Sequence, residues 1–334
     1  MTQTSQELLT RFETDLRHKQ SLNPRQKILV ACSGGPDSVA LFHLMRSLVP
    51  KYHWRLSLIH FNHGLRPGAA KVDERFVRIL ARKYRIPFFC GAGDVKRAAR
   101  EGKTSIEECA RKMRYDFFLK ISREKKISMI VLAHTQDDQA ETVLMRVLQG
   151  TGLRGLQGIR EKVRMGAMTV VRPLLSFSKK QLQAYLALEK IRFRLDRSNA
   201  SSRFVRNRIR LNLLPALRRD FNPRVVEALS RIPVIVAAEN DLISELEAKV
   251  WGKAFKKASR GEIELRRIPF LKAHPALQFR LIERALKKLD PLSGLSFEGW
   301  ELLRQGFSRP RWRCSLPRDI DFALTSKRVI LYKK

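Results

Sequence analysis

The sequence predicts an α/β protein: a doubly wound, mostly parallel sheet, followed by a helical linker and a small α+β C-terminal domain. Short apolar runs alternate with segments of helical periodicity from residue 27 to about residue 150, which is typical of consecutive βαβ units. That alternation stops after about residue 172. The 334 residues are enough for two domains. We expect the first over residues 1–220 and the second over residues 221–334.

The first half contains four predicted strands, each followed by a predicted helix. The strands are expected at residues 27–32, 55–61, 86–91 and 127–134, and the helices at 37–48, 72–84, 104–125 and 137–150. Thr104 and Glu107 have the spacing of a capping box at the start of the third helix. Gly150 is expected to close the fourth helix.

The second half is more helical and more basic. A loop and a helix are expected over residues 172–190, and a very basic segment follows at 192–221. Residues 222–251 are mostly helical in pattern, with Pro233 marking a kink or a break. A further helix is expected at 275–289, and β-rich stretches at 311–334 are separated by the turn signals "PRD" and "TSK".

Charge is the strongest global signal in the composition. Lys and Arg number 67 against 32 Asp and Glu, a net charge of +35. Nucleic acid is the partner class that this excess favours, although a basic proteome or a need for solubility gives the same excess. No apolar run is long enough for a membrane span, and the polar N-terminus has no signal-peptide core. We therefore expect a cytoplasmic protein without a membrane partner.

The segment "SGGPDS", residues 33–38, follows the first predicted strand and opens the first helix. Gly34 and Gly35 allow backbone N–H groups to approach an anion with φ > 0, and the helix directs its positive end to the same place. Ser33 and Ser38 add hydroxyl groups. Asp37 would repel a phosphate unless a cation lies between them, so we interpret it as a Mg²⁺ ligand. An ordinary strand-to-helix turn, capped by Ser and Asp, gives the same pattern.

The S-G-G-x-D-S pattern resembles the loop of the PP-loop, or N-type, ATP pyrophosphatases, whose fold is adenine nucleotide alpha hydrolase-like. The resemblance implies that Ser33, Gly34, Gly35, Pro36, Asp37 and Ser38 hold the pyrophosphate of ATP. It also implies cleavage between the α- and β-phosphates. The loop has no Walker lysine, which fits the cleavage of a bond other than the γ-phosphoryl bond.

Further stretches narrow the resemblance. They are "LIHFNHGLRP" (58–67), "ECARKMRYDFF" (108–118), "LAHTQDDQAETVLMRVLQGTGLRGLQGI" (132–159), "RPLL" (172–175) and "DRSNASSRFVRNRIRLNLLP" (196–215). In this order they resemble the tRNA(Ile)-lysidine synthetases over roughly residues 25–220. The resemblance implies that ATP adenylates C2 of the wobble cytidine of a tRNA(Ile) with anticodon CAU. Free L-lysine then displaces AMP to form lysidine.

Site residues follow from this resemblance. Asp138 and Glu141 lie three residues apart at a predicted helix start, on one face, where they would bind the substrate lysine and help to remove the proton of its amine. The resemblance implies that Arg114 takes part in catalysis. It implies that Arg206 lies near the reacting groups or the tRNA. Asn62 is expected to line the ATP site.

Simpler roles fit several of these residues. Acidic residues at a helix start complement the helix dipole, which is sufficient for Asp137, and Arg114 fits a solvated helix position. His60, His63 and His134 fit either structural roles or the site, where His134 would orient the "HTQDD" turn. Arg203, Arg208 and Arg210 are expected to contact phosphates or solvent. Phe193, Phe204 and Phe221 suit base stacking or core packing.

Two other functions are alternatives to this one. A tRNA thiolation enzyme of the same superfamily would commonly carry paired cysteines, whereas Cys32, Cys90, Cys109 and Cys314 are scattered. A non-catalytic RNA-binding protein on a degenerate nucleotide fold would have lost Asp37 or the acidic pair.

Overall fold

The computed structural model describes all residues except 1–4, 18–21, 65–66, 195–204 and 260. The chain divides into two compact units, Met1–Val234 and Ile235–Lys334. The boundary falls within helix α12 (Val225–Ala254), which runs through Pro233. The helix is therefore not broken at the proline where the sequence predicts a kink or a break.

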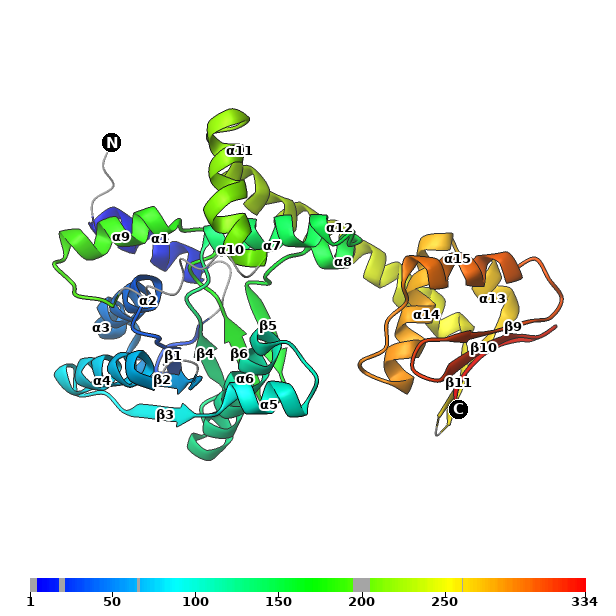
Figure 1. Ribbon diagram of the computed structural model, residues 1–334, viewed down its shortest axis with the longest axis horizontal. Coiled ribbons are helices and arrows are strands. Elements are labelled where there is room, and N and C mark those ends of the chain that lie inside the picture. The colour runs from blue at the N-terminus through cyan, green and yellow to red at the C-terminus, as the bar shows by residue number, and fades with distance from the viewer. Residues whose placement is uncertain (1–4, 18–21, 65–66, 195–204, 260) are drawn as a thin grey trace. The chain divides into compact units, whose positions relative to one another are not determined.

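The first unit is built on a six-stranded sheet in the order β3-β2-β1-β4-β6-β5. Its strands are β1 (Lys27–Ala31), β2 (Arg55–Asn62), β3 (Phe88–Ala92), β4 (Met129–Val131), β5 (Lys162–Met165) and β6 (Met168–Val171). Every pairing is parallel except that of the edge strand β5 with β6. The sequence prediction of a mostly parallel α/β sheet is confirmed, and Figure 1 shows this sheet with the helices around it.

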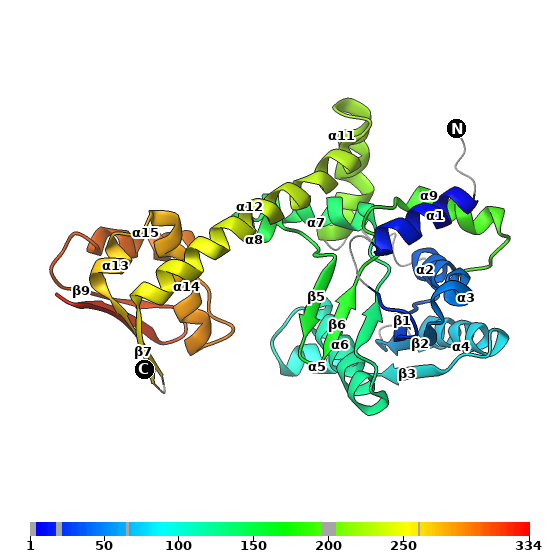
Figure 2. The same ribbon diagram turned by 180° about the vertical axis from the view of Figure 1, so that it is seen from behind.

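Helices cover both faces of the sheet, because its central strands β1 and β4 are apolar on both sides. Ile28 and Val30 of β1 pack with α2 (Pro36–Ser47), α4 (Pro67–Lys83) and α9 (Lys179–Leu188). Leu29, between them in sequence, points to the other face, where α6 (Ile106–Lys125) packs. Figure 2 shows α2, α4 and α9 from behind. Further helices of this unit are α1 (Ser5–Asp15), α3 (Val49–Tyr52), α5 (Val95–Glu101) and α8 (Leu153–Leu156).

The start of α6 differs from the sequence prediction. Its N-cap is Ser105, whose hydroxyl accepts a hydrogen bond from the backbone N–H of Glu108 at 3.1 Å. The predicted capping box of Thr104 and Glu107 is therefore displaced by one residue, because the same spacing recurs at Ser105 and Glu108. Gly150 lies just beyond α7 (Gln136–Leu148), with a φ of 67°, as the sequence predicts for the residue that ends this helix.

The carboxyl ends of β1, β2 and β4 meet at one edge of the sheet. Strand β1 lies between β2 and β4, so the connections from β1 and from β4 leave in different directions along the sheet. Ligands of doubly wound folds bind at such a switch point. At this edge α7 packs against the π-helical turn η3 (Ile209–Leu213), α11 (Leu214–Asp220) and α12. Figure 1 shows α7, α10 (Val205–Arg208) and α11 together.

The second unit is an antiparallel five-stranded sheet with helices packed on it, in the order β7-β8-β11-β10-β9. Its strands are β7 (Phe255–Ser259), β8 (Glu262–Arg266), β9 (Trp312–Leu316), β10 (Ile320–Leu324) and β11 (Arg328–Lys333). Its helices are α13 (Arg267–Leu271), α14 (Pro275–Leu289) and α15 (Phe297–Gly306). The predicted α+β character and both tail turns are confirmed. Strands β7 and β8 were not foreseen from the sequence.

Candidate functional site

The "SGGPDS" segment forms a closed turn between β1 and α2. Ser38 Oγ accepts a hydrogen bond from the Ser33 backbone N–H at 3.1 Å and donates one to the Gly35 carbonyl at 2.9 Å. Gly34 has a φ of 90°, whereas Gly35 has an extended φ of −71°. Only Gly34 therefore has the positive φ that the sequence analysis expected of both glycines. No side chain caps α2 at Gly35, so its first backbone N–H groups are available to an anion.

Asp37, in the first turn of α2, is partly buried, and one of its carboxylate oxygens has no matching donor among the described residues. Its Oδ1 is buried and has no hydrogen-bond partner among the described residues. Burial raises the pKa of Asp37 to about 6, with the Lys179 charge acting in the opposite direction. A buried carboxylate oxygen without a partner is unfavourable for the fold. It is therefore positioned for a cation that the protein itself does not supply.

A cavity of about 720 Å³ opens at the switch point of the sheet. It is lined by the loop after β1, by the ends of β2 and β4, and by residues of α6, α7, α9 and η3. Ser33, Gly35, Pro36, Asp37, Ser38 and Asn62 all lie along it. Asn62 also accepts a hydrogen bond from the Gly64 backbone N–H at 3.0 Å. This volume lies within the range of ordinary ligand pockets.

Three histidines line the same cavity, in different states. His60 has its Nδ1 2.8 Å from the Cys32 carbonyl, so one ring nitrogen is used to hold the strand ends together. His63 and His134 each keep a buried Nδ1 without a hydrogen-bond partner among the described residues. Burial lowers the pKa of His63 to about 4 and that of His134 to about 3. Both imidazoles are therefore neutral near pH 7 and add no positive charge.

Arg114 of α6 lines the cavity, and no carboxylate of the described residues pairs with it. Its Nε is buried and unbonded, and its guanidinium carbon lies 5.8 Å from the centre of the Tyr115 ring. Burial lowers its pKa, and the charges of Arg111, Arg172 and Arg206 act in the same direction. The surroundings of Arg114 are thus already positive. An anion bound in the cavity would offset both the unfavourable free energy of burying the Arg114 charge and its repulsion by the neighbouring arginines.

Asp138 presents its carboxylate to the cavity from the first turn of α7. Its Oδ2 accepts hydrogen bonds from the Thr135 N–H at 2.9 Å and from Oγ1 at 3.0 Å, within a capping box. Its Oδ1 lies 3.2–3.4 Å from the cationic groups of Lys179, Arg206 and Arg210. Burial raises the pKa of Asp138, but Lys179 and Arg206 outweigh burial and hold it below its ordinary value. Asp138 therefore stays ionised.

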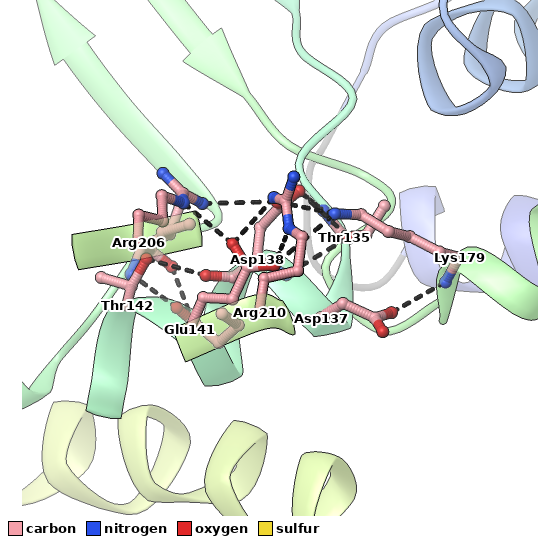
Figure 3. Close-up of polar contacts among 10 residues, drawn as sticks. Thr135, Asp137, Asp138, Glu141, Thr142, Lys179, Arg206 and Arg210 are labelled. Carbon is pink, nitrogen blue, oxygen red and sulfur yellow. Dashed lines mark hydrogen bonds and ion pairs between the residues drawn. The ribbon is translucent and has the colours of Figure 1, made fainter. Parts of the chain in front are cut away.

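Glu141 lies behind Asp138, with only 1% of its side chain exposed, and it is not part of the cavity wall. Its Oε2 accepts from Arg206 Nε at 2.9 Å, and its Oε1 accepts from Arg210 Nε at 2.6 Å. Figure 3 shows both arginines converging on the two carboxylates. Arg210, which the sequence predicts to contact phosphate or solvent, is bound by this pair of carboxylates and also lines the cavity.

Lys179, at the start of α9, is the third cation of this cluster. Its Nζ lies 3.2 Å from Asp138 Oδ1 and 3.7 Å from Glu141 Oε1. Its backbone N–H donates to Asp137 Oδ2 at 2.8 Å, an interaction also drawn in Figure 3. Asp137 thus caps the neighbouring helix α9, which is a structural role. We use the name acidic cluster for Asp138, Glu141, Lys179, Arg206 and Arg210.

The structure brings most of the predicted residues together. Asp37, Asn62, Arg114 and Asp138 line one cavity with the loop residues Ser33, Gly35, Pro36 and Ser38, whereas Gly34 is not part of its wall. Arg206 pairs with Asp138 and with Glu141, which lies behind it. Arg210 also lines the cavity, as do Lys179 and Arg194, which were not proposed from the sequence. Arg194 N–H donates to the Gly34 carbonyl at 2.9 Å.

The remaining basic and aromatic candidates separate. Arg208 is exposed, Phe193 packs against the core of the first unit, and Phe221 is 79% exposed. Arg203 and Phe204 lie outside the described residues. All four cysteines are free. Among the described helices, none is both long enough and apolar enough to cross a bilayer.

Comparisons with known proteins show what the chain is similar to. Residues 4–217 match the model of a PP-loop domain. Proteins named tRNA(Ile)-lysidine synthase are similar to the chain: that of Clostridium tetani is 33% identical over 81% of the chain, and that of Symbiobacterium thermophilum is 34% identical over 85%. The alignments cover 57% and 60% of those proteins, so the chain spans less than two thirds of their length. The resemblance found from the motifs is confirmed.

A solved structure supports the fold. The U34-tRNA thiolase NcsA from Methanococcus maripaludis has a TM-score of 0.59 and 15% sequence identity. The match covers 70% of this chain and 79% of that chain. At this identity the likeness concerns the fold alone, and it confirms the adenine nucleotide alpha hydrolase-like class.

Proposed function

The chain belongs to the PP-loop domain family, and on that premise we propose that it is an ATP-dependent ligase acting on tRNA. In the proposed reaction the wobble cytidine of a tRNA(Ile) with anticodon CAU is adenylated at C2, and pyrophosphate leaves. The amine of free L-lysine then displaces AMP and forms lysidine. One observation carries the proposal. Asp37 Oδ1, Arg114 Nε, His63 Nδ1 and His134 Nδ1 are buried, unpartnered and gathered on one cavity, beside the carboxylate of Asp138.

The ATP end of the site lies at the phosphate loop. The uncapped first turn of α2 and the backbone around Gly34 would bind phosphate oxygens. Asp37 would hold Mg²⁺, because its unpartnered oxygen fits a hard cation. No group of three His, Cys, Asp or Glu side chains among the described residues forms a metal cage. Phosphate oxygens and water would therefore complete the shell, and the ion would supply charge neutralisation for the leaving pyrophosphate.

The amine end lies at the acidic cluster. Asp138 is ionised and faces the cavity. Glu141 adds a second carboxylate, and the Lys179 ammonium lies 3.2 Å from Asp138 Oδ1 and 3.7 Å from Glu141 Oε1. The Lys179 ammonium at this position supports the proposal that the substrate ammonium binds here. A carboxylate at this point would also assist loss of the proton from the attacking amine.

Mass analysis of the tRNA tests the proposal. The protein is incubated with tRNA(Ile) bearing CAU, ATP, Mg²⁺ and L-lysine, and the anticodon fragment should gain one lysine less one water. Omitting lysine, or replacing ATP by its α,β-methylene analogue, should remove the gain. An exchange of oxygen for sulfur with a sulfur donor would indicate a thiolase. An unchanged tRNA that remains bound would indicate an RNA-binding protein without catalysis.

Arg114 gives a first prediction on the chemistry. Arg114→Gln should lower the rate of pyrophosphate release by about 100-fold, because it removes the charge facing the developing negative charge. Affinity for the α,β-methylene analogue should fall less than about tenfold, since the loop supplies most of the phosphate contacts. Single-turnover release and equilibrium binding measure the two effects.

Arg111→Gln is the matched control, because Arg111 is exposed on the same helix and lies over the Tyr115 ring at 4.8 Å. It should release pyrophosphate within about threefold of the unmodified rate. Equal losses in both variants would show that Arg114 acts only through the general positive field of the helix.

A further inference from the structure

Lys179 occupies the position that the proposed function assigns to the substrate. Its Nζ contacts Asp138 Oδ1 at 3.2 Å and Glu141 Oε1 at 3.7 Å, and its side chain is 25% exposed. Figure 3 shows the side chain extending from α9 to Asp138. Both the side chain of lysine and the substrate present an ammonium group on a flexible stem. In the absence of ligand, the acidic pair is therefore bound by an ammonium of the chain itself.

The charges of the acidic cluster leave no room for another ammonium. Two carboxylates, Asp138 and Glu141, face three cations, Lys179, Arg206 and Arg210. A substrate ammonium would make four cations against two anions at contact distance in a partly buried site, where repulsion is weakly screened. One of the three resident cations must move before the substrate can bind.

The contact lengths indicate which cation moves. Arg210 donates to Glu141 through Nε at 2.6 Å and through Nη2 at 2.9 Å, and Arg206 donates to it through Nε at 2.9 Å. These are short charge-assisted contacts, and the Arg210 pair is bidentate. Lys179 makes one hydrogen bond of 3.2 Å and a longer ion pair of 3.7 Å. Lys179 is thus the most weakly bound of the three cations. Its compact ammonium on a flexible side chain can move most easily to another anion.

The phosphate loop, which is the second place where the Lys179 ammonium would meet negative charge, lies in the same cavity. Lys179 lines the wall that also contains Ser33, Gly35 and Asp37, and its charge lowers the pKa of Asp37 against the effect of burial. The backbone of Lys179 is fixed by Asp137, and Ser178 and Gln181 form a capping box around it. Only the side chain needs to rotate. The phosphate loop, which has no lysine of its own, lies along the same wall.

We propose that Lys179 alternates between the acidic pair and the polyphosphate of ATP, so that ATP binding vacates the amine subsite. This rests on the proposed function, because it assumes that ATP and an amine share the cavity. Without nucleotide, Lys179 blocks the subsite. With nucleotide, its ammonium supplies the charge that the loop lacks, and Asp138 becomes accessible. By linkage, lysine then strengthens ATP binding by the same factor as ATP strengthens lysine binding.

The experiment measures this coupling by calorimetry, without tRNA. L-Lysine is titrated into the unmodified chain with and without saturating α,β-methylene ATP and Mg²⁺, and should bind at least tenfold more tightly with the analogue. In Lys179→Ala, analogue affinity should fall at least tenfold. Lysine should bind this variant more tightly without nucleotide than it binds the unmodified chain, and the coupling should fall below about threefold. Lys179→Arg keeps the charge and should restore analogue affinity to within about threefold.

Lys180→Ala is the matched control, because Lys180 is the next residue on the same turn and is exposed. It should behave as the unmodified chain, and urea unfolding confirms that each variant is folded. Uncoupled binding of both ligands to the unmodified chain would overturn this inference and leave the proposed function standing. So would unchanged analogue affinity and coupling in Lys179→Ala. Failure of the unmodified chain to bind either ligand would overturn the proposed function, and the inference with it.

Discussion

Asp37→Asn is expected to abolish pyrophosphate release and, at the same time, to stabilise the folded protein. The loss of activity follows because a neutral amide cannot hold Mg²⁺ against the phosphates as a carboxylate does. The gain in stability follows because the native fold buries a carboxylate oxygen that has no partner. Burial raises the pKa of Asp37 from 3.8 to about 6, which corresponds to roughly 3 kcal/mol of unfavourable free energy when the group is ionised.

The sign of the pH dependence follows from that shift. Between pH 3.8 and about pH 6 the folded state binds more protons at Asp37 than the unfolded state does. The stability that protonation gives is therefore complete below pH 3.8 and is lost as the pH rises through about 6. Asp37→Asn should exceed the unmodified chain in free energy of unfolding by about 3 kcal/mol at pH 8, and the difference should vanish near pH 3.5.

Urea unfolding at both pH values, with pyrophosphate release at pH 8, measures the two effects. Asp116→Asn, at an exposed position of α6, is the control and should change neither. An Asp37→Asn protein that releases pyrophosphate at the normal rate would refute the metal-binding role. A variant less stable than the unmodified chain at pH 8 would mean that the carboxylate has a partner in solution.

The parallel sheet was predictable because local sequence patterns specify it. The strands at 27–32, 55–61, 86–91 and 127–134 are short apolar runs between amphipathic helices, and such runs identify buried strands. Strands β5 and β7 were missed for a physical reason, and their hairpin partners β6 and β8 were missed with them. The segments "KVRM" and "FKKAS" are basic, and β5 and β7 are edge strands. Charged edge strands carry weak apolar patterns.

The site was predictable only where its residues belong to one motif. The phosphate loop is continuous in sequence, and Asp138 and Glu141 lie on one helical face. Lys179 and Arg210 contact Asp138 across 41 and 72 residues of sequence. In a chain with 67 basic residues, spacing does not distinguish a cation that pairs with a buried carboxylate from one in solvent. Their roles depend on the packing of α7 against η3 and on the placement of α9.

Glu141→Gln is expected to lower the free energy of unfolding by about 3 kcal/mol at pH 7, because Arg206 and Arg210 lose their shortest carboxylate contacts and keep only the 3.3 and 3.4 Å contacts with Asp138. Glu141 is 1% exposed, and Arg206 and Arg210 are 33% and 28% exposed. The arginines can therefore turn partly to water, which places the effect at the lower end of the range for broken buried pairs. The new amide would also direct an N–H donor at guanidinium donors. Urea unfolding of both proteins measures the difference.

The control and a double variant separate charge from packing. Glu124→Gln removes a surface partner 3.9 Å from Lys120 and should change stability by less than about 0.5 kcal/mol. Arg210→Met combined with Glu141→Gln removes the partner that the first change leaves unpaired. The double variant should therefore lose less free energy of unfolding than Glu141→Gln and Arg210→Met lose in sum, by at least about 1 kcal/mol. Additive losses would show that Glu141 stabilises α7 by packing alone, and the two arginines would then be held for the substrate rather than for the fold.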